Sequence, residues 1–251
     1  MSKLTDRIRA ANQAGRTALV PFLPAGYPDK ERFFAELEQL DAGGADVIEV
    51  GMPFSDPVAD GPTVERASLH ALELGVTLKW ILAELAKRTY QAGLVLMGYY
   101  NPVYKYGLER FAADAAKAGV NGVIIADLPF EESGPIRAAL KAHGLCLIPL
   151  VGLNTSRERM ALYAAEADGF VYVVSVLGTT GARGVLPSEI KEKLKLAHEV
   201  FPLPVALGFG LKEPSQLAQF EGLVDAAVFG SALINHLDAG KSSAEFMAAW
   251  Q

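Results

Sequence analysis

Residues 45–67 read ADVIEVGMPFSDPVADGPTVERA, a strand-like apolar run that gives way to an acidic loop containing several prolines. Successive side chains of a strand point to opposite faces, and the run at 45–51 is largely apolar on both faces. Strands of this kind are typical of parallel sheets that are covered on both sides. The stretch therefore predicts an α/β fold with a parallel sheet.

Glu49 and Asp60 are the two carboxylates of this stretch that we single out. By strand alternation Glu49 shares a face with Val47 and Gly51, so its carboxylate must be ion-paired, exposed at an edge or placed in a cavity. If Glu49 faces a cavity, burial raises its pKa and allows it to hold or accept a proton near neutral pH. Asp60 lies in the loop and stays ionised more easily, so the two carboxylates suit a division of roles.

The order of strand then helix recurs along the chain, after an amphipathic helix at the N-terminus. Eight such units with short connections predict one domain over 1–251, a single (β/α)8 TIM barrel with an extra N-terminal helix; a doubly wound sheet is the alternative. The active site of a barrel lies at the C-terminal ends of its strands. Asn154 and Thr155 are predicted to cap the helix after the fifth strand. The predicted strands are 17–26, 45–51, 93–100, 122–127, 145–152, 170–176, 203–210 and 224–230.

The composition argues against several classes of function. The 251 residues are 51% hydrophobic and 21% charged, with a formal net charge of −6 and no long basic block, so we expect a soluble enzyme that binds no nucleic acid. No apolar run reaches the ~18–20 residues that span a bilayer, and the N-terminus lacks a signal-peptide core. We therefore expect a cytoplasmic protein. Cys146, the single cysteine, lies in an apolar run and is interpreted as a buried structural thiol.

Glycine-containing motifs end the last two predicted strands, GFG at 208–210 and GSA at 230–232. Glycine lets backbone N–H groups approach an anion, a following helix supplies partial positive charge, and Ser231 adds a hydroxyl donor. In barrels this arrangement binds phosphate, and the alternative is that the glycines only form tight turns. The segment GTTGARG at 178–184 has the composition of a lid, in which Arg183 meets either an anion or solvent.

The other ionisable residues narrow the chemistry. The four histidines lie in helical patterns without metal-ligand spacing, so we expect no bound metal. No lysine lies in a predicted strand to form a Schiff base, and Asp46, Asp56 and Asp127 are interpreted as cap or turn residues. What remains is acid/base chemistry on a phosphorylated substrate with a flat apolar portion. Apolar and aromatic residues available to hold that portion are Phe22, Leu96, Met97, Tyr99, Ile124, Leu150, Tyr172 and Phe209.

Five motifs resemble those of the tryptophan synthase alpha subunit family, over essentially the whole chain. They are VIEVGMPFSDPVADGPTV at 47–64, PFLPAGYP at 21–28, SVLGTTGARG at 175–184, LGFG at 207–210 and FGSA at 229–232. The resemblance implies a lyase of L-tryptophan biosynthesis that cleaves indole-3-glycerol phosphate to indole and D-glyceraldehyde 3-phosphate, a retro-aldol reaction.

The resemblance also implies roles for individual residues. Glu49 is the general acid/base that protonates C3 of the indole and accepts the hydroxyl proton, and Asp60 holds the indole N–H and stabilises positive charge on the ring. Thr180 in the lid meets Asp60 when the lid closes. Phe22 and Tyr172 line the pocket, and Gly181, Gly210, Gly230 and Ser231 hold the phosphate.

A partner is implied by the same resemblance. It is the beta subunit, which contains pyridoxal phosphate, in an alpha2-beta2 tetramer through which indole passes internally; no cofactor is expected in this chain. The contact regions implied are 53–60, 101–106 and 129–135. The lid here carries ARG where some family members have a longer polar segment, which leaves its closure contacts open.

Three alternatives stay open at this point. One is another phosphate-binding barrel, an isomerase or an indole-forming synthase, which strand-borne lysines or a Cys/Asp pair would favour. A second is a non-catalytic barrel that binds a phosphorylated ligand, against which the presence of both Glu49 and Asp60 argues. The third is a stand-alone indole-3-glycerol phosphate lyase that releases free indole.

Overall fold

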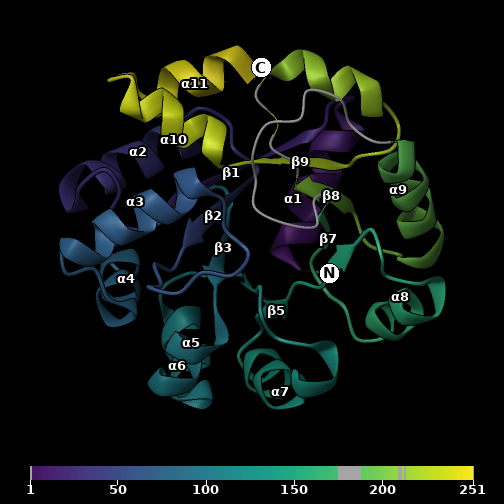
Figure 1. Ribbon diagram of the computed structural model, residues 1–251, viewed down its shortest axis with the longest axis horizontal. Helices are drawn as coiled ribbons and strands as arrows, with labels where there is room; N and C mark the ends of the chain where they lie inside the picture. The colour runs from purple at the N-terminus through teal and green to yellow at the C-terminus, as the bar shows by residue number, and fades with distance from the viewer. Residues whose placement is uncertain (1, 175–187, 209–210, 212, 251) are drawn as a thin grey trace.

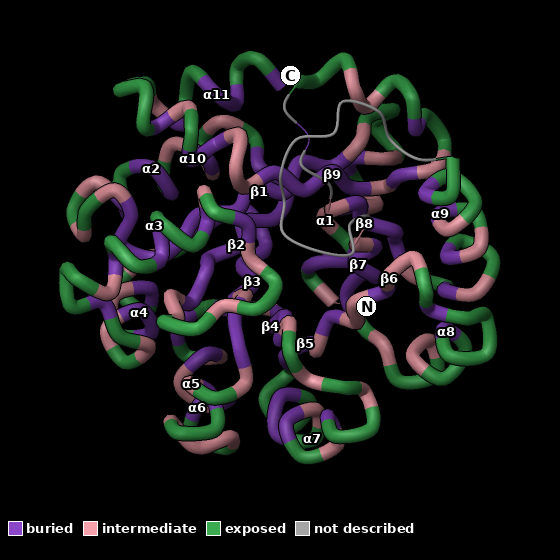
Figure 2. The backbone as a smooth tube through the Cα atoms, viewed as in Figure 1, coloured by how far each residue is buried: buried purple, intermediate pink, exposed green. Residues whose placement is uncertain are grey.

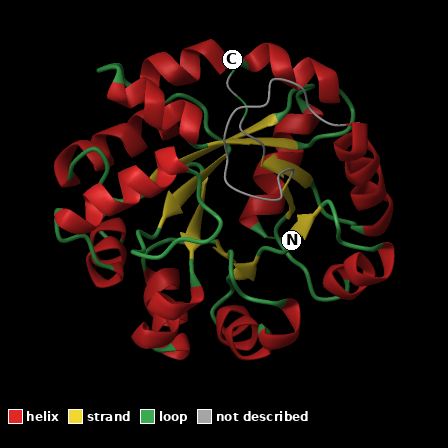
Figure 3. Cartoon of the chain, viewed as in Figure 1, coloured by secondary structure: helices red, strands yellow, loops and turns green. Residues whose placement is uncertain are grey.

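The computed structural model describes residues 2–174, 188–208, 211 and 213–250. Strands form the centre of the molecule and helices surround them (Figure 1, Figure 3). The strands are β1 (Ala18–Pro24), β2 (Val47–Gly51), β3 (Gly93–Gly98), β4 (Gly122–Ile125), β5 (Cys146–Leu147), β6 (Leu150–Gly152), β7 (Val171–Val174), β8 (Val205–Gly208) and β9 (Ala226–Phe229).

The helices are mostly short and follow the strands. They are α1 (Lys3–Gln13), α2 (Lys30–Ala42), α3 (Pro62–Glu73), α4 (Leu78–Leu85), α5 (Tyr100–Tyr106), α6 (Leu108–Lys117), α7 (Gly134–Ala142), α8 (Arg157–Ala164), α9 (Ser188–Val200), α10 (Ser231–Asp238) and α11 (Ser243–Trp250), with 3₁₀ turns η1 (Phe130–Glu132) and η2 (Pro214–Phe220). Within the described ranges, no helix has the length and apolar character needed to cross a membrane.

Neighbouring strands pair in parallel, in the order β5-β4-β3-β2-β1-β9-β8-β7-β6. The two ends of this order, β5 and β6, are consecutive parts of one extended segment. Ile148 donates its N–H to the Val123 carbonyl at 2.9 Å, and Pro149 accepts from the N–H of Tyr172 at 3.0 Å. One segment therefore joins both edges of the sheet, and the predicted barrel is confirmed.

The prediction of one continuous fifth strand over 145–152 is wrong. Its first part, β5, pairs with β4, and its second part, β6, pairs with β7. Pro149 stands between them and has no N–H with which to continue a ladder. Because the pairing partner changes at this point, the described residues form a nine-stranded sheet in place of the eight strands expected.

Helix α1 closes the N-terminal end of the barrel. Its buried residues Leu4 and Ile8 pack with the inward-facing residues of the strands. Leu4 lies against the first residues of β3 and β4: a β-carbon would lie 2.6 Å from Leu4 Cδ2 at Gly93 and 2.8 Å from Leu4 Cδ1 at Gly122. The opposite end, where the strands finish, is left for a site.

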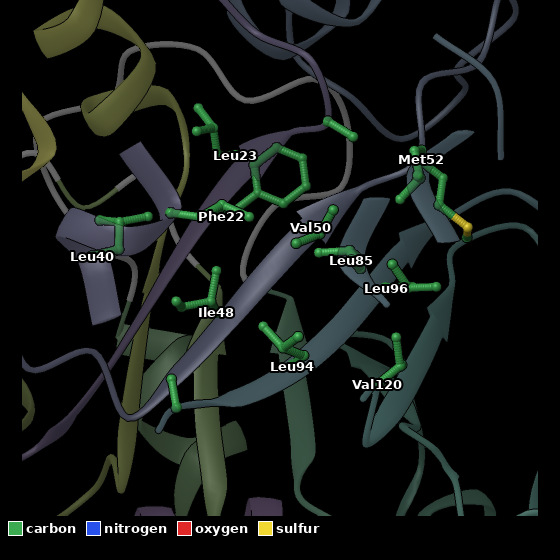
Figure 4. Close-up of a cluster of buried hydrophobic side chains, with 14 of the residues drawn as sticks. Phe22, Leu23, Leu40, Ile48, Val50, Met52, Leu85, Leu94, Leu96 and Val120 are labelled. Carbon is green, nitrogen blue, oxygen red and sulfur yellow. The ribbon is translucent and has the colours of Figure 1, made fainter. Parts of the chain in front are cut away.

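Strand alternation separates two apolar layers. Val47 and Val95 belong to the inner cluster with α1. Ile48 and Leu94, one position along each strand, belong to the outer cluster, which also contains Leu40 of α2 (Figure 4). The central strands are therefore buried, and exposed residues concentrate on the outer helices (Figure 2). Both faces of the sheet are covered, as the sequence of β2 predicts.

Two connections differ from the predicted pattern. The third strand ends at Gly98 and not at residue 100, because Tyr99 is the N-cap of α5, a helix that the sequence interpretation missed. The carboxylate of Asp127 accepts the Tyr100 N–H at 2.8 Å and so satisfies a donor in the first turn of that helix. Ser156, and not Asn154 or Thr155, caps α8: its hydroxyl accepts the Arg159 N–H at 3.2 Å.

Candidate active site

Glu49 is the third residue of β2, opposite Phe22 of β1 and Val95 of β3. Its residue exposure is 0%, and its side chain lines a cavity on the inner face of the barrel. Ile48 belongs to the outer apolar cluster, so the predicted strand alternation is confirmed. A carboxylate is thus placed on the axis side of a strand whose other face packs against helices.

No polar contact in the described part of the chain offsets the cost of burying the Glu49 carboxylate. Neither of its oxygens has a hydrogen-bond partner in the described part of the chain. Burial raises the pKa of Glu49 from 4.5 to about 8, because an unpaired carboxylate in an apolar cavity is costly to ionise. At neutral pH the group therefore holds a proton that it can give up. Glu49 has no partner among the described residues, so the alternative interpretation of it as an ion-paired carboxylate is wrong.

The cavity beside Glu49 has a volume of about 260 Å³. It lies where β1, β2, β3, β7, β8 and β9 finish, as the barrel prediction requires. Its lining is mostly apolar, which suits a flat hydrophobic ligand held by a few polar groups. The lining residues are Phe22, Glu49, Ala59, Asp60, Gly61, Val64, Met97, Ala126, Leu150, Tyr172, Val174, Gly208, Val228, Gly230 and Ser231.

Asp60 reaches this cavity from the loop between β2 and α3. Desolvation raises the pKa of Asp60 above its ordinary value, a hydrogen bond with Tyr99 opposes that rise, and the charge of Glu65 adds to it. Asp60 has a partner, whereas Glu49 has none among the described residues. The pKa of Glu49 is therefore set by burial alone, and that of Asp60 by competing effects.

Tyr99 holds the Asp60 loop in place. Its hydroxyl accepts the N–H of Ala59 at 3.1 Å, and its ring packs on Phe54 with centroids 5.3 Å apart. Tyr99 is 3% exposed and does not belong to the cavity lining. The sequence interpretation offered Tyr99 as a residue for the flat part of the substrate, but the structure places it behind the Asp60 loop.

Phe22 and Tyr172 form aromatic walls of the cavity. A β-carbon at Gly51 would lie 2.7 Å from the Phe22 ring, and one at Gly230 would lie 2.8 Å from it. Phe22 therefore fills the space that two glycines leave. Burial, followed by the charges of Glu49 and Asp60, raises the pKa of Tyr172 well above its ordinary value, so its phenol remains protonated.

Gly230 and Ser231 start helix α10 at the cavity. Gly230 is the N-cap residue, and its carbonyl accepts the N–H of Ile234 at 3.0 Å. The first N–H groups of α10 thus point toward the end of the barrel that holds Glu49, where a helix start favours an anion. The remaining predicted ligand residues, Thr180, Gly181, Phe209 and Gly210, and the lid at 177–184 lie outside the described residues.

Some lining residues were not singled out from the sequence. Val174 and Val228 face the cavity, as does Ala126 just beyond β4. Val174 lies two positions after Tyr172, and Val228 two positions before Gly230, so strand alternation could have identified both. Ala126 lies beyond the end of its strand, where alternation no longer applies.

Other residues of interest have structural partners. Asp46 receives two hydrogen bonds from Arg16, at 2.6 and 2.8 Å, and one from the Leu19 N–H at 2.9 Å, so it is not the cap or turn residue expected. Asp127 lies in the turn after β4, as expected, and accepts the Tyr100 N–H. Burial raises the pKa of the Cys146 thiol to about 12, in agreement with a structural cysteine. Among the described residues, no group of three His, Cys, Asp or Glu side chains is placed to hold a metal ion.

One aromatic cavity at the end of a parallel (β/α)8 barrel brings together a buried, protonated glutamate, a loop aspartate and the start of a helix capped by glycine. These features define an enzyme of acid/base chemistry. The family follows from comparison with known proteins. The family described as "Tryptophan synthase alpha chain" matches residues 8–250, so the chain belongs to that family.

Relatives match over the full length. The chain is 65% identical to the tryptophan synthase alpha chain of Solidesulfovibrio magneticus, covering 100% of this chain and 98% of that protein, and 63% identical to that of Maridesulfovibrio salexigens, covering 100% and 99%. Mycobacterium tuberculosis tryptophan synthase superposes with a TM-score of 0.91 at 36% identity, over 99% of this chain and 95% of that one. The Legionella pneumophila alpha chain gives 0.88 at 31% identity, over 100% and 96%.

Proposed function

We propose that this chain is the alpha subunit of a tryptophan synthase and cleaves indole-3-glycerol phosphate to indole and D-glyceraldehyde 3-phosphate. The observation that carries the proposal is Glu49: a fully buried carboxyl group without a described partner, facing a cavity that Asp60 and Ser231 also line. A general acid, an anchor for a ring nitrogen and an anion site are the three groups that this cleavage needs. Residues 1–251 are proposed to form one domain.

Glu49 both gives and takes the proton of the reaction. Its protonated carboxyl group donates to C3 of the indole, and the ring becomes cationic. The bond from C3 to the hydroxyl-bearing carbon then breaks, and its electron pair returns to the ring as neutral indole. The hydroxyl proton passes to the Glu49 carboxylate while the oxygen becomes the aldehyde of the second product. One proton is given and one is regained, so a single group with a pKa of about 8 serves both steps.

Asp60 is proposed to accept the indole N–H and to stabilise the cationic ring. An ionised carboxylate beside the nitrogen lowers the energy of the charged intermediate more than that of the neutral substrate, which is the requirement for catalysis. Phe22 and Tyr172 are proposed to pack on the indole faces, since both line the cavity. Thr180 is proposed to reach Asp60 when the lid closes.

The phosphate is proposed to bind at the start of α10. Gly230 brings backbone N–H groups close, Ser231 offers its hydroxyl, and the helix supplies partial positive charge. Both residues line the same cavity as Glu49, so phosphate and indole are held at two ends of one site. Gly181 and Gly210 are proposed to add further backbone donors, and Phe209 is proposed to contact the substrate.

A beta subunit that carries pyridoxal phosphate is proposed as the partner, in an alpha2-beta2 assembly in the cytoplasm, with no cofactor bound by this chain. Two of the three proposed contact segments present large exposed hydrophobic residues. Val58, in 53–60, is 78% exposed, and Tyr104, in 101–106, is 65% exposed. Exposed apolar side chains next to an active-site loop fit a partner that covers the site.

The test is indole release from indole-3-glycerol phosphate by the purified chain, measured with and without a beta subunit. Equal amounts of indole and glyceraldehyde 3-phosphate, with strong stimulation by the beta subunit, are expected. Equal rates with and without it favour the stand-alone lyase. Binding of the substrate with no cleavage under either condition favours the non-catalytic barrel.

A further inference from the structure

Three polar side chains far apart in the sequence meet outside the cavity lining: Tyr27, Arg66 and Asp238. Arg66 donates from Nη1 to the Tyr27 hydroxyl at 3.1 Å and pairs through Nη2 with the Asp238 carboxylate. The Tyr27 hydroxyl also donates to Asp238, so each member contacts the other two. We call this group the Tyr27–Arg66–Asp238 hub. It belongs neither to the cavity lining nor to the proposed chemistry.

Each member of the hub comes from an element that also carries part of the site. Tyr27 follows β1, which holds Phe22. Arg66 lies one turn into α3, whose first residue, Pro62, comes two positions after Asp60. Asp238 is the last residue of α10, which begins at Ser231. Helices α3 and α10 pack against each other and against β1 (Figure 1).

The hub is partly shielded from water, which strengthens it. Tyr27 is 5% exposed and the Asp238 side chain 32%, whereas the Arg66 side chain, at 53%, reaches the surface. A second contact fixes the same turn to α3: His70 Nε2 lies 3.0 Å from the Pro28 carbonyl oxygen, and its ring meets that of Tyr27 edge-on. The Arg66 guanidinium donates to two different partners, the Tyr27 hydroxyl and the Asp238 carboxylate, so its orientation is fixed more firmly than in a single exposed ion pair.

We propose that the Tyr27–Arg66–Asp238 hub is a positioning device that fixes the distance between Asp60 and Ser231, the two ends at which one substrate is held. This inference rests on the proposed function. A substrate that must reach both ends at once gains the full affinity of both only if they are held at a separation that its three-carbon chain can span without strain. Ligands that reach only one end do not depend on that separation.

The experiment compares Arg66→Met with wild type by calorimetry, using indole-3-propanol phosphate, which spans both ends and has no hydroxyl to cleave. Indole and glycerol 3-phosphate probe the ends separately. We expect the spanning ligand to bind about tenfold more weakly to Arg66→Met, since misplacement lowers the effective concentration of the second end. The two single-end ligands are expected to bind within about twofold of wild type.

Arg157→Met is the matched control. Arg157 pairs with Glu199 and so joins α8 to α9, with its side chain 55% exposed against 53% for Arg66. This variant is expected to bind all three probes as wild type does. Tyr27→Phe, which keeps the ring and removes the bridging hydroxyl, provides a second variant should Arg66→Met fail to fold, with the same pattern expected.

Two results would contradict the proposed positioning role of the hub. They are an unchanged affinity for the spanning ligand, and an equal loss for all three probes, which a general loss of structure would produce. Wild-type protein with no affinity for the spanning ligand would overturn both this inference and the proposed function. A wild type that cleaves the substrate, together with an unaffected Arg66→Met, would overturn the hub alone.

Discussion

The ring of Tyr172 occupies the space above Gly208: a β-carbon at Gly208 would lie 2.0 Å from Tyr172 Cε1 and 2.3 Å from its hydroxyl oxygen. The two residues lie on the neighbouring strands β7 and β8, and both line the cavity. Glycine at the end of β8 therefore has a specific purpose, which is to leave room for an aromatic wall.

Gly208→Ala is expected to displace Tyr172 and to weaken binding of indole-3-propanol phosphate. Overpacking of this kind costs about 1–3 kcal/mol in the free energy of unfolding. Calorimetric binding and denaturant unfolding measure the two effects. Gly134→Ala is the control, because a β-carbon there has no described atom within 4 Å. Wild-type affinity in Gly208→Ala would show that Tyr172 is not held by this contact.

Tyr99→Phe is expected to loosen the Asp60 loop. The change removes the acceptor of the Ala59 N–H and a hydrogen bond that lowers the pKa of Asp60. A hydrogen bond to a charged group contributes about 1.5–3 kcal/mol, so kcat/KM should fall by roughly ten- to a hundredfold. Steady-state kinetics of the chain without a beta subunit test this, with Tyr104→Phe as a control for loss of an exposed phenol. Unchanged kinetics in Tyr99→Phe would contradict the anchoring role.

Protein stability should fall as the pH rises, because of Glu49. Its folded-state pKa of about 8 exceeds its ordinary value of 4.5, so between these values the folded state keeps a proton that the unfolded state has lost. The resulting stabilisation is full below pH 4.5 and disappears as the pH passes through 8. Between pH 4.5 and 8, the free energy of unfolding of Glu49→Gln should rise relative to that of wild type by on the order of 4 kcal/mol.

Urea unfolding of wild type and Glu49→Gln across this range measures the difference. The control is Glu109→Gln, which makes the same substitution at an exposed position. Parallel pH curves for wild type and Glu49→Gln would mean that Glu49 is ionised in the folded protein at neutral pH.

The rate should follow a bell-shaped pH profile in kcat/KM. The free enzyme must have Glu49 protonated, so the rate should fall as the pH rises through about 8. It must also have Asp60 ionised, and because the pKa of Asp60 is raised, the acid limb should lie above the ordinary aspartate range. A rate that keeps rising beyond pH 9 would be inconsistent with Glu49 as the acid, about one pH unit past its pKa.

Local regularities made much of the barrel predictable. Strand alternation placed Glu49 on the face of Val47 and opposite Ile48, because a period of two depends only on the strand itself. Which of the two faces is the inner one became known only from the structure. The division of the fifth strand at Pro149 was not predictable in the same way. The proline is visible in the sequence, but the change of partner from β4 to β7 is a property of the closed sheet.

Contacts made through loops and over long separations were the least predictable. Tyr99 follows a strand, which made it a candidate for substrate contact, yet the path of the Asp60 loop brings Ala59 to its hydroxyl. Arg66 meets Tyr27 across 39 positions and Asp238 across 172. No periodicity links such residues, and only the packing of α3 against α10 brings them together.

The central claim is that Glu49 moves the proton that cleaves the substrate. Its most direct test is Glu49→Gln, a neutral isostere, assayed for indole formation from indole-3-glycerol phosphate and for binding of indole-3-propanol phosphate. Loss of detectable indole formation, with binding within roughly tenfold of wild type, is the result that the account predicts. Indole formation by Glu49→Gln at a near-normal rate would contradict it.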